Sequence, residues 1–367
     1  MGDLPVPYLV NAAGLLLGVI FGAAVQRSNF CTMGAISDVV LMGDASRLRS
    51  WVLAIAVAML GSQLLHLSGL INLDTSIYAT PNLGWLGAAL GGLLFGFGMV
   101  LAGGCGSRTL VRFGAGNLKS LLVVLMIGIA GYATLRGLLG PARLWLESWS
   151  VVDLKGRGLT SQTLPELLGA GLGLNAVTLR WILGLALPAA MLVWVFKSAR
   201  FRSQPRLVGA GLVIGLVIVG GWAVTGILGA DEFDPTPLAS MTFVAPIGYA
   251  LQYLMTFTGA ALDFGISTVG GVILGAFLMA KADRSFRIES FANAQDVLSH
   301  LLGGILMGVG GVTALGCTIG QGLTGVATLA LGSFVALSGI VIGGILGVRY
   351  LEEGSLPGAI RAIIARG

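Results

Sequence analysis

Charged side chains are scarce in this sequence. They make up 10% of the 367 residues, whereas hydrophobic residues make up 56%. Soluble domains typically carry about 25% charged and about 45–50% apolar residues. A chain this poor in charge is neither a disordered segment, nor a nucleic-acid-binding domain, nor an ordinary soluble enzyme. Its mean hydropathy of +0.93 indicates a membrane protein instead.

Residue types that bind metals are also rare. The chain has two histidines and three cysteines, Cys31, Cys105 and Cys317, and it has no CxxC pair. Spacings this wide match no zinc or iron–sulfur pattern, and a disulfide would leave one thiol over. We therefore expect no metal and no cofactor. Neither an ATP-binding motif nor a basic segment of a cleaved signal peptide is present, so we expect neither an ATPase nor a cleaved signal peptide.

Long apolar runs are what the sequence does contain. A bilayer-spanning helix needs about 20 residues, and the clearest candidate spans are residues 8–25, 51–70, 118–139, 178–197, 207–228, 266–280 and 327–348. Two shorter, glycine-rich segments cover 85–103 and 299–315, and an interrupted apolar stretch covers 243–261. The 59 glycines suit helices that pack closely or break. These features predict an all-α polytopic membrane protein.

Loop charges predict the orientation. Lysine and arginine accumulate in cytoplasmic loops, and here they mark four places: Arg47 and Arg49; Lys197, Arg200, Arg202 and Arg206; Lys281, Arg284 and Arg287; Arg349, Arg361 and Arg366. The loops near Asp74 and around Asp231, Glu232 and Asp234 are acidic. We expect the C-terminus in the cytoplasm and the N-terminus in the periplasm. The polar segment 141–170 has mixed charge, and its side stays open.

An internal repeat divides the chain. The segment Leu90–Cys105 aligns without gaps with Leu302–Cys317, and the offset is 212 residues. A weaker echo joins Gly14–Gly18 to Gly211–Gly215 but carries no second cysteine. The sequence thus predicts one membrane domain over 1–367, with repeat halves at about 8–140 and 178–350 and a connecting segment at about 141–177.

All three cysteines follow an apolar helix that runs into a polar, glycine-containing turn. A broken helix leaves backbone groups unpaired and is tolerated where it is buried in protein or lines a cavity, and repeats in transporters commonly build their sites from such breaks. A helix restarting after the break would offer free N–H groups to a small anion. The candidate substrate pathway comprises Cys31, Cys105, Cys317, Gly104, Gly316, Arg27, Asn29, Thr32, Ser107, Arg108, Thr318 and Gln321.

Plainer interpretations compete with this one. A membrane cysteine is often a small packing residue, and an arginine such as Arg27, Arg108 or Arg112 can extend to the interface instead of lining a path. The repeat and the polar flanks favour a functional role for the thiols. A thiol is soft and polarisable, so its matching ligand is a soft, sulfur-rich one.

At these residues the sequence resembles the YeeE/YedE sulfur-transport family. The motifs are QRSNFC ending at Cys31, LAGGC ending at Cys105 and LGCTIGQGL around Cys317. The basic loop Lys281–Arg287, followed by Ala294 and Gln295, is also similar, and the resemblance covers about residues 10–348. One departure is Leu315, which stands where the first repeat has Gly103.

The resemblance implies uptake of thiosulfate, or a closely related inorganic sulfur anion, through the bacterial inner membrane. It implies two pseudo-symmetric halves of full transmembrane helices and short, partly inserted helices, forming an hourglass whose narrow waist holds Cys31, Cys105 and Cys317. A small TusA-like sulfur-carrier protein is an expected cytoplasmic partner. Two alternatives stay open: a membrane sulfurtransferase that forms a cysteine persulfide, and a transporter of sulfite, sulfide or a selenium compound.

Overall fold

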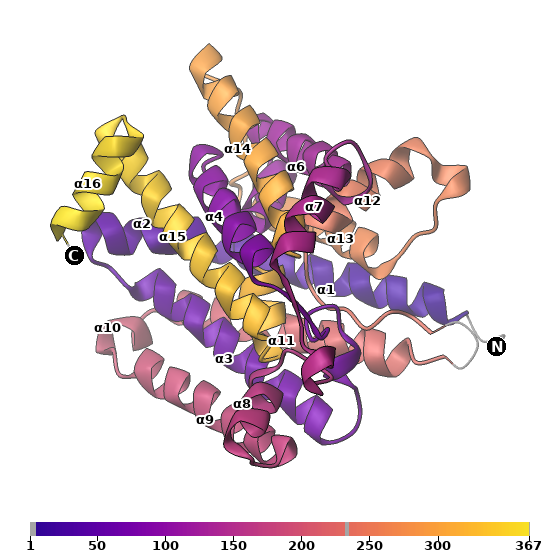
Figure 1. Ribbon diagram of the computed structural model, residues 1–367. Helices are drawn as coiled ribbons and strands as arrows, with labels where there is room; N and C mark the ends of the chain where they lie inside the picture. The colour runs from indigo at the N-terminus through magenta and orange to yellow at the C-terminus, as the bar shows by residue number, and fades with distance from the viewer. Residues whose placement is uncertain (1–4, 232–234, 367) are drawn as a thin grey trace.

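The computed structural model describes residues 5–231 and 235–366, which form a bundle of helices (Figure 1). Within these ranges, nine helical segments are long and apolar enough to cross a bilayer. Their main helices are α1 (Val6–Ser28), α3 (Ser46–Leu67), α4 (Trp85–Leu101), α6 (Leu118–Arg136), α9 (Ala176–Phe196), α11 (Pro205–Ala223), α13 (Phe264–Ala282), α14 (Ala294–Thr313) and α15 (Leu331–Glu353).

Shorter elements connect or flank these helices. The short α-helices are α2 (Thr32–Ser37), α5 (Gly106–Gly114), α7 (Gly140–Ser150), α8 (Leu164–Leu172), α10 (Ala199–Arg202), α12 (Val244–Met255) and α16 (Leu356–Arg366). Three π-helical turns are η1 (Asp38–Met42), η4 (Val224–Leu228) and η6 (Gly320–Gly325), and three 3₁₀ turns are η2 (Leu73–Thr75), η3 (Lys155–Arg157) and η5 (Phe257–Gly259). Two strands, β1 (Asn82–Gly84) and β2 (Val151–Asp153), pair antiparallel.

The expected all-α membrane fold is confirmed, and each of the seven clear apolar runs falls on one of the nine spans. The two glycine-rich segments are helices α4 and α14, and α14 already begins at Ala294. The interrupted stretch 243–261 holds the turn η5 and the helix α12, whose 12 residues are too short to span a membrane. Side-chain caps start several helices, including Asp263, which accepts from Ile266 N at 2.7 Å.

Glycine decides how the long helices pair. Helix α1 packs along α13, α3 along α11, α4 along α15 and α6 along α14. At each of these contacts small residues let one backbone approach the other. A Cβ on Gly22 of α1 would lie 2.2 Å from the Val272 carbonyl oxygen of α13, and one on Gly96 of α4 would lie 2.1 Å from the Ile340 carbonyl oxygen of α15. The close packing that the glycines predict thus has a direct steric basis at these contacts.

Helices α4 and α14, which carry the repeat, also pack on each other and do so reciprocally. A Cβ on Gly98 would lie 2.8 Å from the carbonyl oxygen of Gly303, and one on Gly303 would lie 2.7 Å from that of Gly98. Gly91 and Gly310 form the matching pair, with 2.6 Å in both directions. Because Gly91 is equivalent to Gly303 and Gly98 to Gly310, each half presents the same patch to the other, as across a two-fold axis. The two helices run antiparallel, which is the arrangement of an inverted repeat.

The basic loops gather on one face of the molecule, which we call the basic face. There, Arg49 on α3 donates to the Val195 carbonyl at 3.3 Å, and Lys119 pairs with Asp296 at 2.6 Å. Figure 1 shows α10 and α16 at this side and the start of α1 at the other. Of the acidic residues expected opposite, Glu232 and Asp234 lie outside the described residues.

The segment 141–170, whose side the sequence left open, lies on the face opposite the basic loops. Its strand β2 pairs with β1, which directly precedes α4. Thr163 bridges to Ala330 at the start of α15, and Arg180 binds Asp74 at 2.6 Å. Arg180 also donates to the Thr163 hydroxyl at 3.3 Å, so it links the segment to the loop around Asp74. The division into halves at 8–140 and 178–350 stays a prediction.

Candidate functional site

The three cysteines occupy equivalent local structures. Cys31 and Cys105 are the N-cap residues of α2 and α5, and Cys317 precedes the turn η6, whose Gln321 N–H donates to its carbonyl at 2.8 Å. In each case the residue two positions earlier adopts the left-handed backbone conformation: Asn29 (φ 55°), Gly103 (φ 68°) and Leu315 (φ 59°). This conformation ends the incoming helix. The expected break and restart at all three thiols is therefore present.

Cys31 and Cys105 lie side by side, with their sulfur atoms 3.9 Å apart. The Cys105 sulfur also lies 3.4 Å from the Ser107 hydroxyl oxygen. Cys317 instead accepts from the Gly320 backbone N–H at 3.4 Å. The site thus consists of a thiol pair at the starts of α2 and α5 and a single thiol just before η6. All three belong to one continuous buried cluster and none forms a disulfide.

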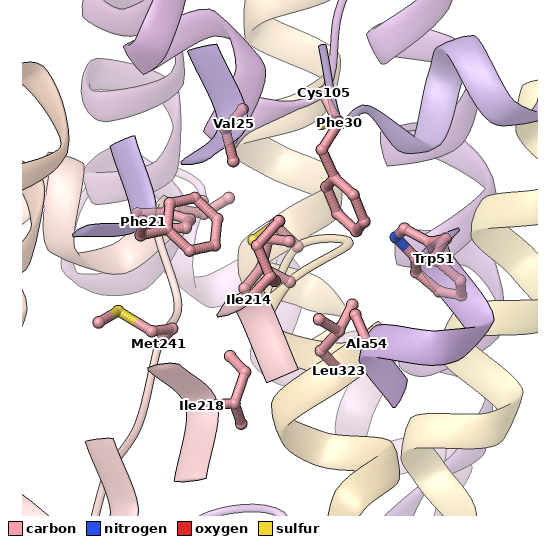
Figure 2. Packing of buried hydrophobic residues seen from close by; sticks show 14 of the residues in the cluster. Phe21, Val25, Phe30, Trp51, Ala54, Cys105, Ile214, Ile218, Met241 and Leu323 are labelled. Atoms are coloured by element: carbon pink, nitrogen blue, oxygen red, sulfur yellow. The ribbon is translucent and has the colours of Figure 1, made fainter. Parts of the chain in front are cut away.

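Apolar side chains fill the space around the thiols and close the waist. Figure 2 shows Phe30 between Phe21 and Trp51, with Ile214 and Leu323 below it and Cys105 next to it. Cys31 is 8% exposed, Cys105 1% and Cys317 0%. Because the three thiols are this deeply buried, passage of an anion requires the side chains around them to move.

A wide cavity opens on the basic face and reaches Cys31. Its volume is about 820 Å³. Five arginines and two aspartates line it: Arg27, Arg47, Arg108, Arg112, Arg206, Asp38 and Asp44. Asp38 is engaged by Arg47, and Asp44 pairs with Arg200 at 2.9 Å. Hydrogen bonds from Ser46 lower the pKa of Asp44, which keeps this carboxylate ionised at neutral pH. The cavity still carries a surplus of positive charge and attracts anions.

Two arginines of α5 donate hydrogen bonds to the segments that precede Cys31 and Cys105. Arg108 donates to the Asn29 side-chain oxygen at 2.5 Å and to the Val25 carbonyl at 3.3 Å, which links α5 to the end of α1. Arg112 donates to the Gly103 carbonyl at 3.2 Å. Arg27, by contrast, has an exposed side chain at the cavity wall. Of the expected pathway residues, Arg27, Asn29, Cys31 and Arg108 line the cavity directly.

A much smaller hollow lies on the opposite face, above Cys317. Its volume is about 30 Å³, and its lining includes Tyr78, Gln162, Leu315, Gln321 and Ser333. Gln321 donates its amide N–H to the Ala314 carbonyl, while its side-chain oxygen is buried without a partner. Gln321, which follows Gly316 and Cys317 in the same helix break, therefore lines this hollow, whereas Cys31 lines the cavity on the basic face.

The hydroxyl groups next to the thiols are buried. Thr32 and Thr318 directly follow Cys31 and Cys317, and both of their side-chain oxygens lack a hydrogen-bond partner. A buried polar group without a partner costs free energy and calls for an explanation. Ser107 bonds to Cys105 instead, and the neighbouring Gly104 is buried. These hydroxyls offer hydrogen bonds to a ligand that reaches the waist.

Sequence reasoning missed part of this site. Arg47 and Arg206 served only as orientation markers, and Tyr78 was not considered. Arg47 and Arg206 line the cavity because α3 and α11 pack beside it, which the sequence alone does not show. Tyr78 lines the smaller hollow described above. Among the described residues no cluster of three or more histidines, cysteines, aspartates or glutamates can hold a metal ion.

The nine apolar spans within residues 5–231 and 235–366 define a multi-pass membrane protein. Residues 27–346 match the sulphur transport family, and the chain belongs to this family. It is 31% identical over 341 residues to the thiosulfate transporter TsuA of Spirochaeta thermophila, which covers 90% of this chain and 96% of that protein. It is 26% identical over 339 residues to TsuA of Escherichia coli (90% and 92%). A 100-residue match of 34% identity joins it to the probable transporter YedE of Salmonella typhimurium (27% and 23%). The resemblance seen in the cysteine motifs is confirmed.

Proposed function

We propose that this protein carries thiosulfate, or a closely related inorganic sulfur anion, into the cytoplasm through the bacterial inner membrane. The observation that supports this most strongly is the triplet of thiols in equivalent helix breaks, next to an arginine-lined cavity. Two relatives that match over nine-tenths of the chain are named thiosulfate transporters. In this proposal the protein is a transporter and catalyses no reaction.

The basic face is cytoplasmic in this proposal, because lysine and arginine favour that side of a membrane. The C-terminal helix α16 then lies inside and the start of α1 outside. The segment 141–170 and the hollow above Cys317 face the periplasm, and the arginine-lined cavity opens into the cytoplasm.

This orientation orders the thiols along the path. The anion reaches Cys317 from the hollow near Gln321, passes to Cys105 and then to Cys31, and leaves through the cavity. The order follows from placement: Cys31 lines the cavity, Cys105 lies 3.9 Å behind it, and Cys317 belongs to the helix break whose Leu315 and Gln321 line the outer hollow.

The chemistry of the waist suits a soft anion. Thiosulfate is a dianion with one terminal sulfur, and thiol S–H groups donate weak hydrogen bonds to it. Thr32 and Thr318 directly follow two of the thiols, and Ser107 lies two residues after Cys105. Their hydroxyl groups can donate hydrogen bonds to the oxygens of thiosulfate. Contacts of this strength allow release as well as capture, which conduction requires. Continued consumption of sulfur inside the cell would drive net uptake.

A small TusA-like sulfur-carrier protein fits the cytoplasmic end of this path. The cavity is wide, positively charged and open on the basic face. A cysteine thiolate of a carrier that docks there would attack the terminal sulfur of the arriving thiosulfate, keep that sulfur as a persulfide and release sulfite into the cytoplasm. This consumption of thiosulfate would keep its gradient directed inward. Pull-down of such a carrier by the purified protein, and its loss when Arg206 and Arg27 are changed to glutamate, would test this partnership.

Uptake of sulfur-labelled thiosulfate into proteoliposomes tests the transport proposal. Wild type should accumulate label, whereas Cys105→Ala and Cys317→Ala should not, although both should keep the melting temperature of a folded protein. Uptake that is equal in all three would reduce the thiols to packing residues. Mass spectrometry of the three cysteines after turnover separates transport from sulfurtransferase chemistry, since only the latter leaves a persulfide.

A further inference from the structure

Trp51 buries a hydrogen-bond donor without a partner. Its side chain comes from α3 and the residue is 5% exposed, yet its indole nitrogen has no hydrogen-bond partner. An indole N–H can only donate, and a buried tryptophan usually finds an acceptor. An unpaired buried donor is costly to a fold. The indole N–H of Trp51 is therefore free to donate to a ligand.

Trp51 packs against the turn that follows Cys317 and belongs to the same buried cluster as the residue before Cys31. A Cβ on Gly322 would lie 2.8 Å from the indole ring of Trp51, so the ring packs against the turn η6 that follows Cys317. Trp51 also belongs to the cluster that contains Phe30, which directly precedes Cys31. In Figure 2 its nitrogen is turned toward Phe30 and the other labelled side chains rather than away from them.

We propose that Trp51 is a substrate-binding residue of the waist, whose indole N–H donates to an oxygen of the anion as it passes from Cys317 to the Cys105–Cys31 pair. This inference rests on the proposed transport of a sulfur oxyanion. The thiols contact the soft sulfur, and Trp51 contacts the hard oxygens, so that both ends of the anion are bound during the transfer.

A neutral donor suits this place in the path. An arginine at the waist would hold a dianion too tightly for release, and an acidic side chain would repel it. The indole N–H neither ionises nor accepts, so it selects for acceptors without trapping them. Its large ring also fills the closed waist when no anion is present.

The test removes the N–H while the shape of the side chain is kept. Benzothienylalanine, a tryptophan analogue in which sulfur replaces the N–H, is incorporated at position 51, and Trp51→Phe is made beside it. Thiosulfate uptake into proteoliposomes is measured against substrate concentration. We expect both changes to lower uptake efficiency by about tenfold or more, the loss of one hydrogen bond to a charged group. The melting temperature of the benzothienylalanine protein should stay that of wild type.

Trp222 provides the matched control. It is another fully buried tryptophan of the same cluster with an unpaired indole N–H, but its ring packs edge-on against Tyr78, with centroids 6.4 Å apart. We expect Trp222→Phe to transport like wild type. The inference is overturned if the benzothienylalanine protein transports like wild type, or if Trp222→Phe loses as much uptake as Trp51→Phe. Absence of uptake by wild type would instead refute the transport proposal itself.

Discussion

Gly103 and Leu315 occupy the same place in the two halves and share one backbone conformation, with φ of 68° and 59°. Leucine in place of glycine therefore leaves the backbone conformation of the turn unchanged. It adopts the left-handed conformation that glycine adopts freely and that other residues enter at a cost of about 1–2 kcal/mol. Leu315 is 48% exposed and lines the outer hollow.

Leu315→Gly should relieve this strain. Glycine gains more conformational entropy than leucine in the unfolded chain, which opposes this gain by about 0.5–1 kcal/mol. The net stabilisation should therefore be about 0.5–1 kcal/mol. Removal of the side chain also widens the entrance, so uptake should be equal to or faster than in wild type. Thermal melting and thiosulfate uptake measure the two effects. A lower melting temperature would show that Leu315 contributes packing that outweighs the strain.

The reciprocal contact of α4 and α14 predicts a strong asymmetry between glycines. In Gly303→Ala the new Cβ would lie 2.6 Å from the Ala102 backbone nitrogen, which no side-chain rotation relieves. The helices must separate, at a cost of about 1–3 kcal/mol, and we expect a lower melting temperature and reduced uptake.

Gly209→Ala is the control for that change. It lies in α11, where a Cβ meets nothing within 4 Å. Alanine in a helix should stabilise by about 0.5–1 kcal/mol. Equal melting temperatures for the two variants would mean that the tight approach of α4 to α14 does not hold the halves together.

Sequence reasoning predicted the local features of this protein better than the distant contacts. Apolar runs of bilayer length gave the spans, and the polar turns gave the helix breaks at Cys31, Cys105 and Cys317, because both depend on residues close together in the chain. The 3.9 Å contact of Cys31 with Cys105 and the separate place of Cys317 depend on how α1, α4 and α14 pack. Trp51 escaped notice for the same reason, since an apolar helix position does not show whether its N–H has a partner.

Arg27 should act through charge alone, because its side chain is exposed at the cavity wall. Arg27→Gln should slow thiosulfate exchange several-fold at low salt, and the deficit should shrink at high salt as screening removes the long-range attraction. Arg27→Lys keeps the charge and should exchange like wild type. Both rates are measured in proteoliposomes at several ionic strengths. A deficit that is independent of salt would indicate a direct contact instead.

The thiol pair predicts selective oxidation. A disulfide bond is about 2.05 Å long, so Cys31 and Cys105, with sulfurs 3.9 Å apart, need only a small shift to join when an oxidant such as diamide takes up their two electrons and two protons. The cavity admits the oxidant to Cys31, whereas Cys317 is fully buried. Diamide should therefore abolish uptake, and dithiothreitol should restore it. Mass spectrometry of the oxidised protein should find the Cys31–Cys105 pair linked and Cys317 free, while a link to Cys317 would contradict the proposed order of the thiols along the path.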